Sequence, residues 1–250
     1  MNFNSLFYLY FSTCRYMILS LLAVILAFTP SVSEAGTVKI MPLGDSITQG
    51  YRGRDSYRRG LWLKLKEAGA DVDFVGSMKN SFMGTPAHED FDMDHEGHWG
   101  WRADQILENI DSWAARFKPD IVLMHLGTND IGSHQDIIET VTELERIIDI
   151  LRKHNPGVTI LLAQILPVAF SYANIRIMTF NDALPELAKS LNSDKSSIII
   201  VNHFSGFDAT RDTYDGIHPN DSGIKKMVIK WIAALNKVLT NTGISKDIVY

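Results

Sequence analysis

Five short apolar segments with strand character alternate with five segments of helical spacing, and this alternation most limits the fold available to the chain. The apolar segments span 38–43, 72–75, 121–126, 158–166 and 198–201. The helical segments span 57–68, 103–117, 137–151, 174–191 and 221–239, with Pro185 as a kink or boundary in the fourth. The alternation is typical of βαβ units, so it predicts an α/β protein with a five-stranded parallel sheet and helices on both faces.

The first strand ends in a short polar motif, Gly44-Asp45-Ser46. Right-handed crossovers bring the carboxyl ends of parallel strands to one edge of the sheet, where ligands bind in open α/β folds. At that edge the Ser46 hydroxyl could meet a substrate, and nearby backbone N–H groups could face developing negative charge. The motif also suits a plain turn, because Gly and Asp are turn formers.

Two later stretches carry side chains suited to the same chemistry. The third strand runs into Gly127-Thr128-Asn129-Asp130, and Asp215-Gly216-Ile217-His218 precedes the last helix. The Asn129 amide could donate to an oxyanion, or could cap a helix. The Asp215 carboxylate could accept the Nδ1–H of His218 and leave Nε2 facing a serine, although a surface turn is the alternative.

The segment 77–98 is long and lacks periodicity, and such segments are usually functional or disordered. It leads into Trp99-Gly100-Trp101. A glycine at position 100 would let the backbone approach a ligand and offer its N–H. The rings of Trp99 and Trp101 could line a substrate cleft, or could belong to the core.

In this order and spacing, the stretches resemble the SGNH hydrolases, also called the GDSL-type esterase and lipase superfamily. The resemblance covers 38–240 and rests on Gly44-Asp45-Ser46, Gly100, Gly127-Thr128-Asn129-Asp130 and Asp215-Gly216-Ile217-His218. It implies a three-layer, flavodoxin-like α/β/α fold and an esterase that needs no metal or organic cofactor. Its implied roles are Ser46 as nucleophile, His218 as base, Asp215 as the partner of His218, and an oxyanion hole of Ser46 N–H, Gly100 N–H and the Asn129 amide.

The wider motifs are similar to carbohydrate esterase family 3, whose members include acetyl xylan esterases. The matching stretches are 40–48, 73–77, 95–98 with Gly100-Trp101, and 215–220. This similarity implies removal of acetyl or other short acyl groups from a polysaccharide such as xylan through an acyl-serine intermediate. The candidate residues for substrate binding are Asp45, Tyr51, Trp99 and Trp101. The arginines at 52, 54 and 58 could donate to sugar hydroxyls or uronic-acid carboxylates, or could lie in a solvated loop.

Residues 1–35 have the pattern of a secretory signal peptide. An apolar run over 17–28 follows Arg15, and small residues at Ser33 and Ala35 predict cleavage after Ala35. Residues 36–250 would then form a single secreted or periplasmic domain with no stable membrane association. An uncleaved N-terminal membrane anchor is the alternative, and Met17 is a second possible start. The only cysteine, Cys14, lies in this segment, so no disulfide is expected in the mature chain.

Charge and motif content limit which other functions the chain could have. The net charge is −5 and there is no basic patch, so nucleic-acid binding has no support. A lysophospholipase or thioesterase acting on longer acyl chains would need an apolar groove, which the sequence does not reveal. The segment 88–98 is dense in His, Asp and Glu, so a metal- or sugar-binding protein without catalysis is a further alternative, although the spacing is not that of an EF-hand.

Overall fold

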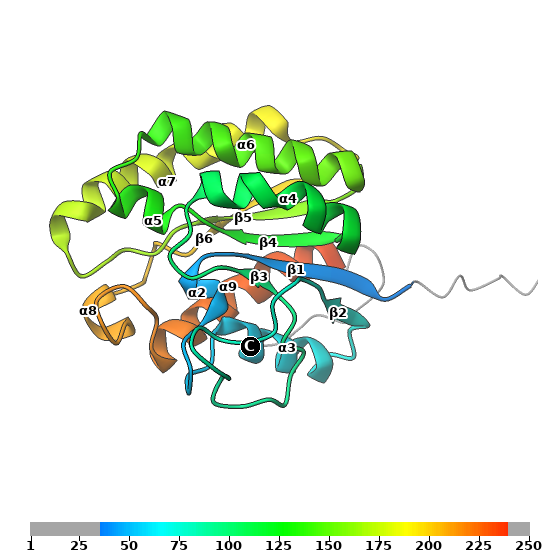
Figure 1. The fold of residues 1–250 in the computed structure, drawn as a ribbon, viewed down its shortest axis with the longest axis horizontal. Coiled ribbons are helices and arrows are strands. Elements are labelled where there is room, and N and C mark those ends of the chain that lie inside the picture. The colour runs from blue at the N-terminus through cyan, green and yellow to red at the C-terminus, as the bar shows by residue number, and fades with distance from the viewer. Residues whose placement is uncertain (1–35, 240–250) are drawn as a thin grey trace, which may run out of the picture. The chain divides into compact units, whose positions relative to one another are not determined.

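The computed structural model describes residues 36–239 (Figure 1). The predicted signal peptide, residues 1–35, lies outside the described residues, as does the end of the predicted domain over 36–250, so both stay predictions. Within 36–239, no helix combines the length and the apolar character needed to cross a membrane.

A parallel sheet forms the middle layer of this unit. Its strands are β1 (Val38–Gly44), β2 (Val72–Phe74), β3 (Glu96–Gly97), β4 (Ile121–His125), β5 (Thr159–Gln164) and β6 (Ile198–Asn202). They run in the order β2-β1-β4-β5-β6, with β3 paired to the end of β1, and every pairing is parallel. The predicted parallel sheet is confirmed. The two-residue β3 is an addition that is too short to show periodicity in the sequence.

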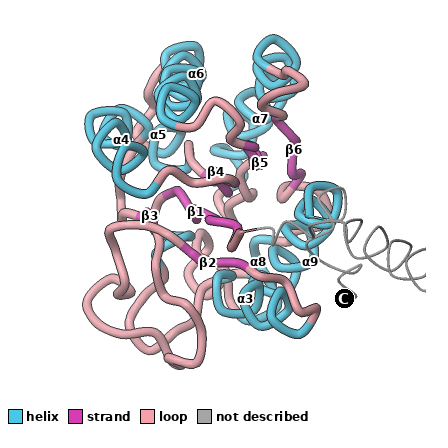
Figure 2. Tube along the Cα trace, turned by 90° about the vertical axis from the view of Figure 1, so that its right-hand side faces the viewer, coloured by secondary structure: helices cyan, strands magenta, loops and turns pink. Residues whose placement is uncertain are grey.

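Helices cover both faces of the sheet, as Figures 1 and 2 show. On one face α3 (Tyr57–Glu67) packs against α9 (Asp221–Leu239), and on the other α6 (Ile137–His154) packs against both α4 (Ala103–Phe117) and α7 (Ser171–Leu191). Three short helices lie in the connections: α2 (Ser46–Gln49), α5 (Thr128–Gly132) and α8 (Ala209–Asp212). Successive strand residues point to opposite faces, so Ile40 joins the core beneath α3 and α9 while Met41 joins the core beneath α4 and α6.

The helix α7 begins at Ser171 instead of 174. Pro185, predicted to be a kink or a boundary, lies inside the helix and does not end it. Leu184 and Leu187, on either side of the proline, are both buried in the core. This burial holds the helix together across a residue that cannot donate a backbone hydrogen bond.

The strand order creates a switch point at β1. The chain moves from β1 to β2 on one side, and later places β4 on the other side of β1. Crevices for ligands form at such points, beyond the carboxyl ends of the two diverging strands. Ser46 follows β1 and Asn129 follows β4, so both lie at this crevice.

His125 and His203 lie buried beneath the sheet edge, with their ring centroids 5.9 Å apart. None of their ring nitrogens has a hydrogen-bond partner among the described residues. Burial lowers the pKa of His125 from 6.5 to about 4. The folded state therefore binds fewer protons than the unfolded chain between these two values, so the stability associated with neutral His125 is lost as the pH falls through this window.

We expect a His125→Leu variant to gain stability relative to the wild type as the pH falls from 6.5 to 4, because leucine has no proton to bind. Over this pH range, the unfolding free energy of the variant relative to that of the wild type should rise by on the order of 3 kcal/mol. Urea unfolding of both proteins at several pH values measures it. A difference that is the same at every pH contradicts this account.

Candidate active site

Ser46 is the first residue of α2, immediately beyond the end of β1. Asp45 caps this turn, since its Oδ1 accepts the backbone N–H of Ile47 at 2.9 Å. Gly44 is required because a Cβ there would lie 2.4 Å from the carbonyl oxygen of His125. The tight strand-to-turn junction thus fixes the Ser46 backbone at the switch point of the sheet.

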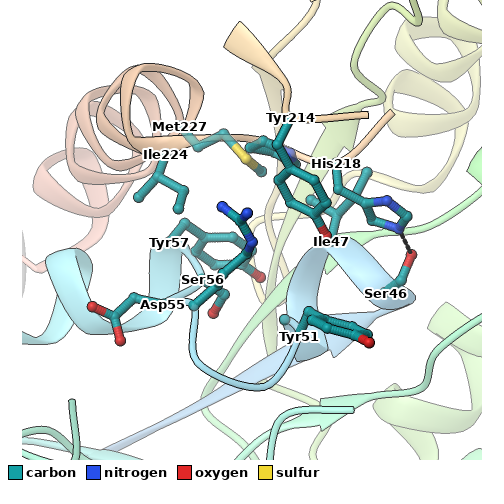
Figure 3. A pocket seen from close by; sticks show the side chains of 13 residues that line it. Ser46, Ile47, Tyr51, Asp55, Ser56, Tyr57, Tyr214, His218, Ile224 and Met227 are labelled. Atoms are coloured by element: carbon teal, nitrogen blue, oxygen red, sulfur yellow. Dashed lines mark hydrogen bonds between the residues drawn. The ribbon is translucent and has the colours of Figure 1, made fainter. Parts of the chain in front are cut away.

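Three side chains form a continuous hydrogen-bonded relay. His218 Nδ1 lies 2.7 Å from Asp215 Oδ2. His218 Nε2 lies 2.9 Å from Ser46 Oγ, the hydrogen bond that is dashed in Figure 3. With the ring proton on Nδ1 donated to Asp215, Nε2 can accept the proton of the Ser46 hydroxyl. The fold therefore brings together the three residues that the sequence analysis names as nucleophile, base and base partner.

The carboxylate of Asp215 is held in its ionised form. Burial alone would raise its pKa, but the backbone N–H of His218, the His218 ring and the backbone N–H of Ile217 all donate to it and hold the pKa below its ordinary value. An ionised Asp215 can orient the imidazole and offset the positive charge that forms when His218 takes a proton.

Gly100 and Asn129 face the same pocket as Ser46. Gly100 has φ of +77° in a turn closed by the Trp101 N–H donating to the His98 carbonyl at 3.1 Å, a conformation that favours glycine. Asn129 Nδ2 donates to the Trp101 carbonyl at 2.8 Å, which fixes the amide and leaves its second N–H available. The three predicted oxyanion donors are thus neighbours in space.

The pocket beside Ser46 is open and has a volume of about 590 Å³. Its lining includes polar side chains, among them Asn129 and Arg102, and apolar side chains, among them Val168, Phe170 and Ile177. A second, much narrower cleft is also lined by Ser46, together with Tyr51, Tyr57 and Tyr214 (Figure 3). Ser46 therefore borders both a pocket that can receive a large group and a cleft that can receive little.

Two of the candidate substrate-binding residues line neither of the pockets at Ser46. Asp45 has no exposed surface, and burial raises its pKa to about 7 despite the N–H of Ile47, so it serves as a helix cap. Trp101 stacks on His98 at 4.3 Å and packs against the core, lining neither pocket at Ser46. The side chain of Trp101 therefore packs against the core, which is the alternative that the sequence left open. Only its backbone carbonyl contributes to the site, where it accepts the Asn129 amide.

Tyr51 and Trp99 do lie at the site. Trp99 lines the open pocket and Tyr51 lines the narrow cleft, and their ring centroids are 5.6 Å apart. The Trp99 backbone N–H donates to Gln49 Oε1 at 2.8 Å, a contact across 50 residues that links its loop to α2. Nothing in the sequence around Gln49 indicates this contact.

Arg58 has a structural role that the sequence analysis missed. Its guanidinium is buried and donates to the carbonyls of Thr48, Gln49 and Met93. Burial lowers its pKa to about 10. The suggestion that Arg58 could contact substrate is therefore corrected, since the side chain instead fastens the end of α2 to the loop before β3.

We expect an Arg58→Met variant to lose roughly 3 kcal/mol of unfolding free energy, because buried carbonyls would lose their donor. Chemical denaturation with a fluorescence readout measures the loss. Arg52→Met is the matched control, since Arg52 is exposed and should change stability little. Equal stability of the two variants would show that Arg58 is dispensable.

The acidic segment 88–98 is held by separate contacts. Asp90 pairs with Arg59 at 2.6 Å, Asp94 pairs with Lys79 at 2.9 Å, and Glu96 Oε1 lies 2.7 Å from His98 Nε2. Within 36–239, no group of three or more His, Cys, Asp or Glu side chains is placed to hold a metal ion. In the described fold, Asp90, Asp94 and Glu96 instead form pairs that hold this loop in place.

The chain is similar to several known esterases. A curated multidomain esterase from Ruminococcus flavefaciens is 30% identical over 230 residues, which is 83% of this chain and 29% of the relative, so the chain spans under a third of that protein. The crystal structure of a carbohydrate esterase family 3 protein from Talaromyces cellulolyticus matches with TM-score 0.74 and 32% identity, over 82% of this chain and 99% of the other. An acetyl esterase mutant crystallised with an acetate ion matches with TM-score 0.74 and 31% identity, over the same shares.

The fold and these likenesses define the class of the protein, which is that of the SGNH-type α/β fold shared with these esterases. The GDSL-like lipase/acylhydrolase family model matches residues 43–226, and the chain belongs to that family. The resemblance seen in the sequence is therefore confirmed at the level of family and fold.

Proposed function

We propose that the protein is a secreted serine esterase that removes acetyl groups from a polysaccharide such as xylan. The observation that carries the proposal is the Ser46–His218–Asp215 relay, with distances of 2.9 and 2.7 Å, at the edge of an open pocket. The similar acetyl esterase with an acetate ion and the family 3 carbohydrate esterase support the acyl group and the substrate class. Export rests on the signal-like pattern of residues 1–35.

The proposed reaction follows from the geometry of the relay. Ser46 Oγ bonds to the ester carbonyl carbon as its proton passes to His218 Nε2, and the carbonyl electron pair moves onto the oxygen. The N–H groups of Ser46 and Gly100 and the Asn129 amide would hold that oxyanion. When the intermediate collapses, the sugar oxygen leaves with the proton from Nε2. Water then repeats the sequence, releasing acetate and free Ser46.

The substrate assignment is tested by acetate release from acetylated xylan by residues 36–250. Aryl esters of acetyl, butyryl and decanoyl groups measured beside it report the limit on acyl length. Acetate release together with a preference for acetyl esters is the expected result. Absence of acetate release from xylan, with turnover of aryl acetate intact, would overturn the carbohydrate assignment while leaving the serine chemistry.

The apolar side chains that line the open pocket favour one other substrate. Val168, Phe170 and Ile177 could contact a longer acyl chain, as in the lysophospholipase or thioesterase alternative. A groove of this kind is not visible in the sequence, because its residues come from the end of the β5–α7 connection and from α7 itself. Faster turnover of decanoyl than of acetyl esters would favour this second function.

Asn129→Ala is expected to lower kcat for aryl acetate by on the order of 10²- to 10³-fold, the usual cost of one lost oxyanion donor. KM should change little, because the ester oxygen carries its charge only in the transition state. Steady-state kinetics on the purified variant measure both constants. A rise in KM with kcat unchanged would place Asn129 in ground-state binding.

A further inference from the structure

The imidazole of His218 belongs to a run of stacked rings. It stacks with Trp99 at a centroid distance of 4.6 Å and an interplanar angle of 18°, and with Tyr214 at 5.7 Å and 16°. Trp99 in turn stacks on Phe82 at 4.7 Å and 15°. The relay from Ser46 to Asp215 lies in the plane of this imidazole, and the aromatic rings lie against its face.

The two rings that contact His218 are themselves held in place. The Trp99 backbone is fastened to the Gln49 side chain, and its indole is backed by Phe82. The Tyr214 backbone N–H donates to the His218 carbonyl at 3.0 Å, and the guanidinium of Arg54 lies 4.2 Å from the centre of the Tyr214 ring. Both rings therefore offer surfaces whose orientation is set by other parts of the fold.

Stacked rings can serve the base in two ways. They prevent rotation of the imidazole out of the line between Asp215 and Ser46. Their π faces also attract a cation, and His218 becomes an imidazolium when it takes the Ser46 proton. The attraction is absent for the neutral ring, so it favours the transition state over the resting enzyme.

We propose that Trp99 and Tyr214 are positioning residues that hold the His218 ring and stabilise its protonated form. This inference rests on the proposed serine mechanism and replaces the reading of Trp99 as a flat platform for sugar. It gives the tryptophan before Gly100 a part in proton transfer.

Other charged and titratable groups line the two pockets that His218 borders. Asp215 contacts His218 directly, and the walls of the two adjoining pockets carry further groups of both signs. They are Tyr51, Arg54, Asp55 and Tyr57 on the side of the narrow cleft, and Arg102, His134 and Arg176 on the side of the open pocket. Trp99→Leu and Trp99→Phe both retain all of these groups, so a shift that Trp99→Leu causes and Trp99→Phe reverses reports the lost ring face.

The test compares Trp99→Leu with Trp99→Phe across the pH range, using an aryl acetate too small to need a sugar platform. Trp99→Leu should lower kcat by about three- to tenfold and move the acid limb of kcat/KM to lower pH by about half a unit to one unit. Trp99→Phe keeps a π face and should restore most of both. KM should stay close to that of the wild type.

A matched pair at the second ring keeps the test decisive if Trp99→Leu fails to fold. Tyr214→Phe retains the ring face and should leave the acid limb where it is in the wild type, whereas Tyr214→Leu should reproduce the shift of the acid limb. Trp62→Leu serves as the control for loss of a tryptophan elsewhere, since Trp62 stacks edge-on against Phe74 on the α3 side of the sheet.

Three results would overturn the inference. A lower kcat with an unmoved acid limb would mean a purely structural role, and a raised KM with normal kcat would mean a substrate platform. A Trp99→Leu variant with wild-type kinetics would mean no role in the reaction. In each case an inactive Ser46→Ala enzyme would leave the serine mechanism standing, so failure of the inference is distinguishable from failure of the proposed function.

Discussion

Ser46→Ala is expected to lower kcat for aryl acetate by on the order of 10⁴- to 10⁶-fold, since no acyl-enzyme can then form. The Ser46 Oγ is the group that His218 Nε2 contacts at 2.9 Å, and alanine leaves that nitrogen with nothing to deprotonate. The remaining activity would come from water attacking an ester held by the oxyanion donors. Steady-state rates at high enzyme concentration are needed to measure it.

The control for this variant is Ser112→Ala, on the exposed surface of α4, where the hydroxyl donates only to the Asn109 carbonyl. It should retain full activity. Mass spectrometry after brief exposure to substrate adds a second readout, because an acetyl adduct should form on the wild type and not on Ser46→Ala. Undiminished turnover by Ser46→Ala would overturn the proposed mechanism.

Asp215→Asn is expected to reduce kcat by about 10³- to 10⁴-fold while leaving the fold intact. The asparagine oxygen can still accept the backbone N–H groups of Ile217 and His218, so the loop geometry has the same support. Its amide nitrogen, however, donates where the carboxylate accepted. The imidazole would then carry its proton on Nε2, directed at Ser46, and could not act as a base.

The double variant Asp215→Asn/His218→Ala separates this explanation from simple loss of charge. If Asp215 acts only through the histidine, the double variant should be no slower than His218→Ala alone, because residues that act as a unit are not additive. Asp182→Asn, an exposed change on α7, is the matched control. A further rate loss in the double variant would assign Asp215 a separate function.

The sequence predicted the sheet and the placement of the relay for a clear physical reason. Each strand is a buried run between polar turns, and parallel strands bring their following loops to one edge. Ser46 and His218, which are 172 residues apart, could thus be expected to meet without knowledge of any side-chain contact. The pattern of apolar residues predicts a parallel sheet, and the topology of such a sheet brings these two loops to the same edge.

Side-chain direction was the part that the sequence could not reveal. Asp45 is adjacent to Ser46, yet it turns inward to cap α2, and Trp101 is adjacent to Gly100, yet it packs on His98. Arg58 lies in the same arginine-rich stretch as the exposed Arg52 and Arg54 but is buried among carbonyls from three other residues. Such outcomes depend on contacts between distant segments, which leave no local pattern.

The division of the site among separate loops has a consequence for how proteins of this architecture diverge. The relay comes from the segments after β1 and before α9, whereas Phe170 lies at the end of the connection from β5 to α7. The backbone of that connection also supports the loop of His218, because the Ala169 N–H donates to the Gly216 carbonyl at 2.8 Å. Side-chain exchanges at Val168 and Phe170 would therefore reshape the lining of the open pocket while this backbone contact is kept. A library confined to these two side chains could explore new ester substrates with the relay retained.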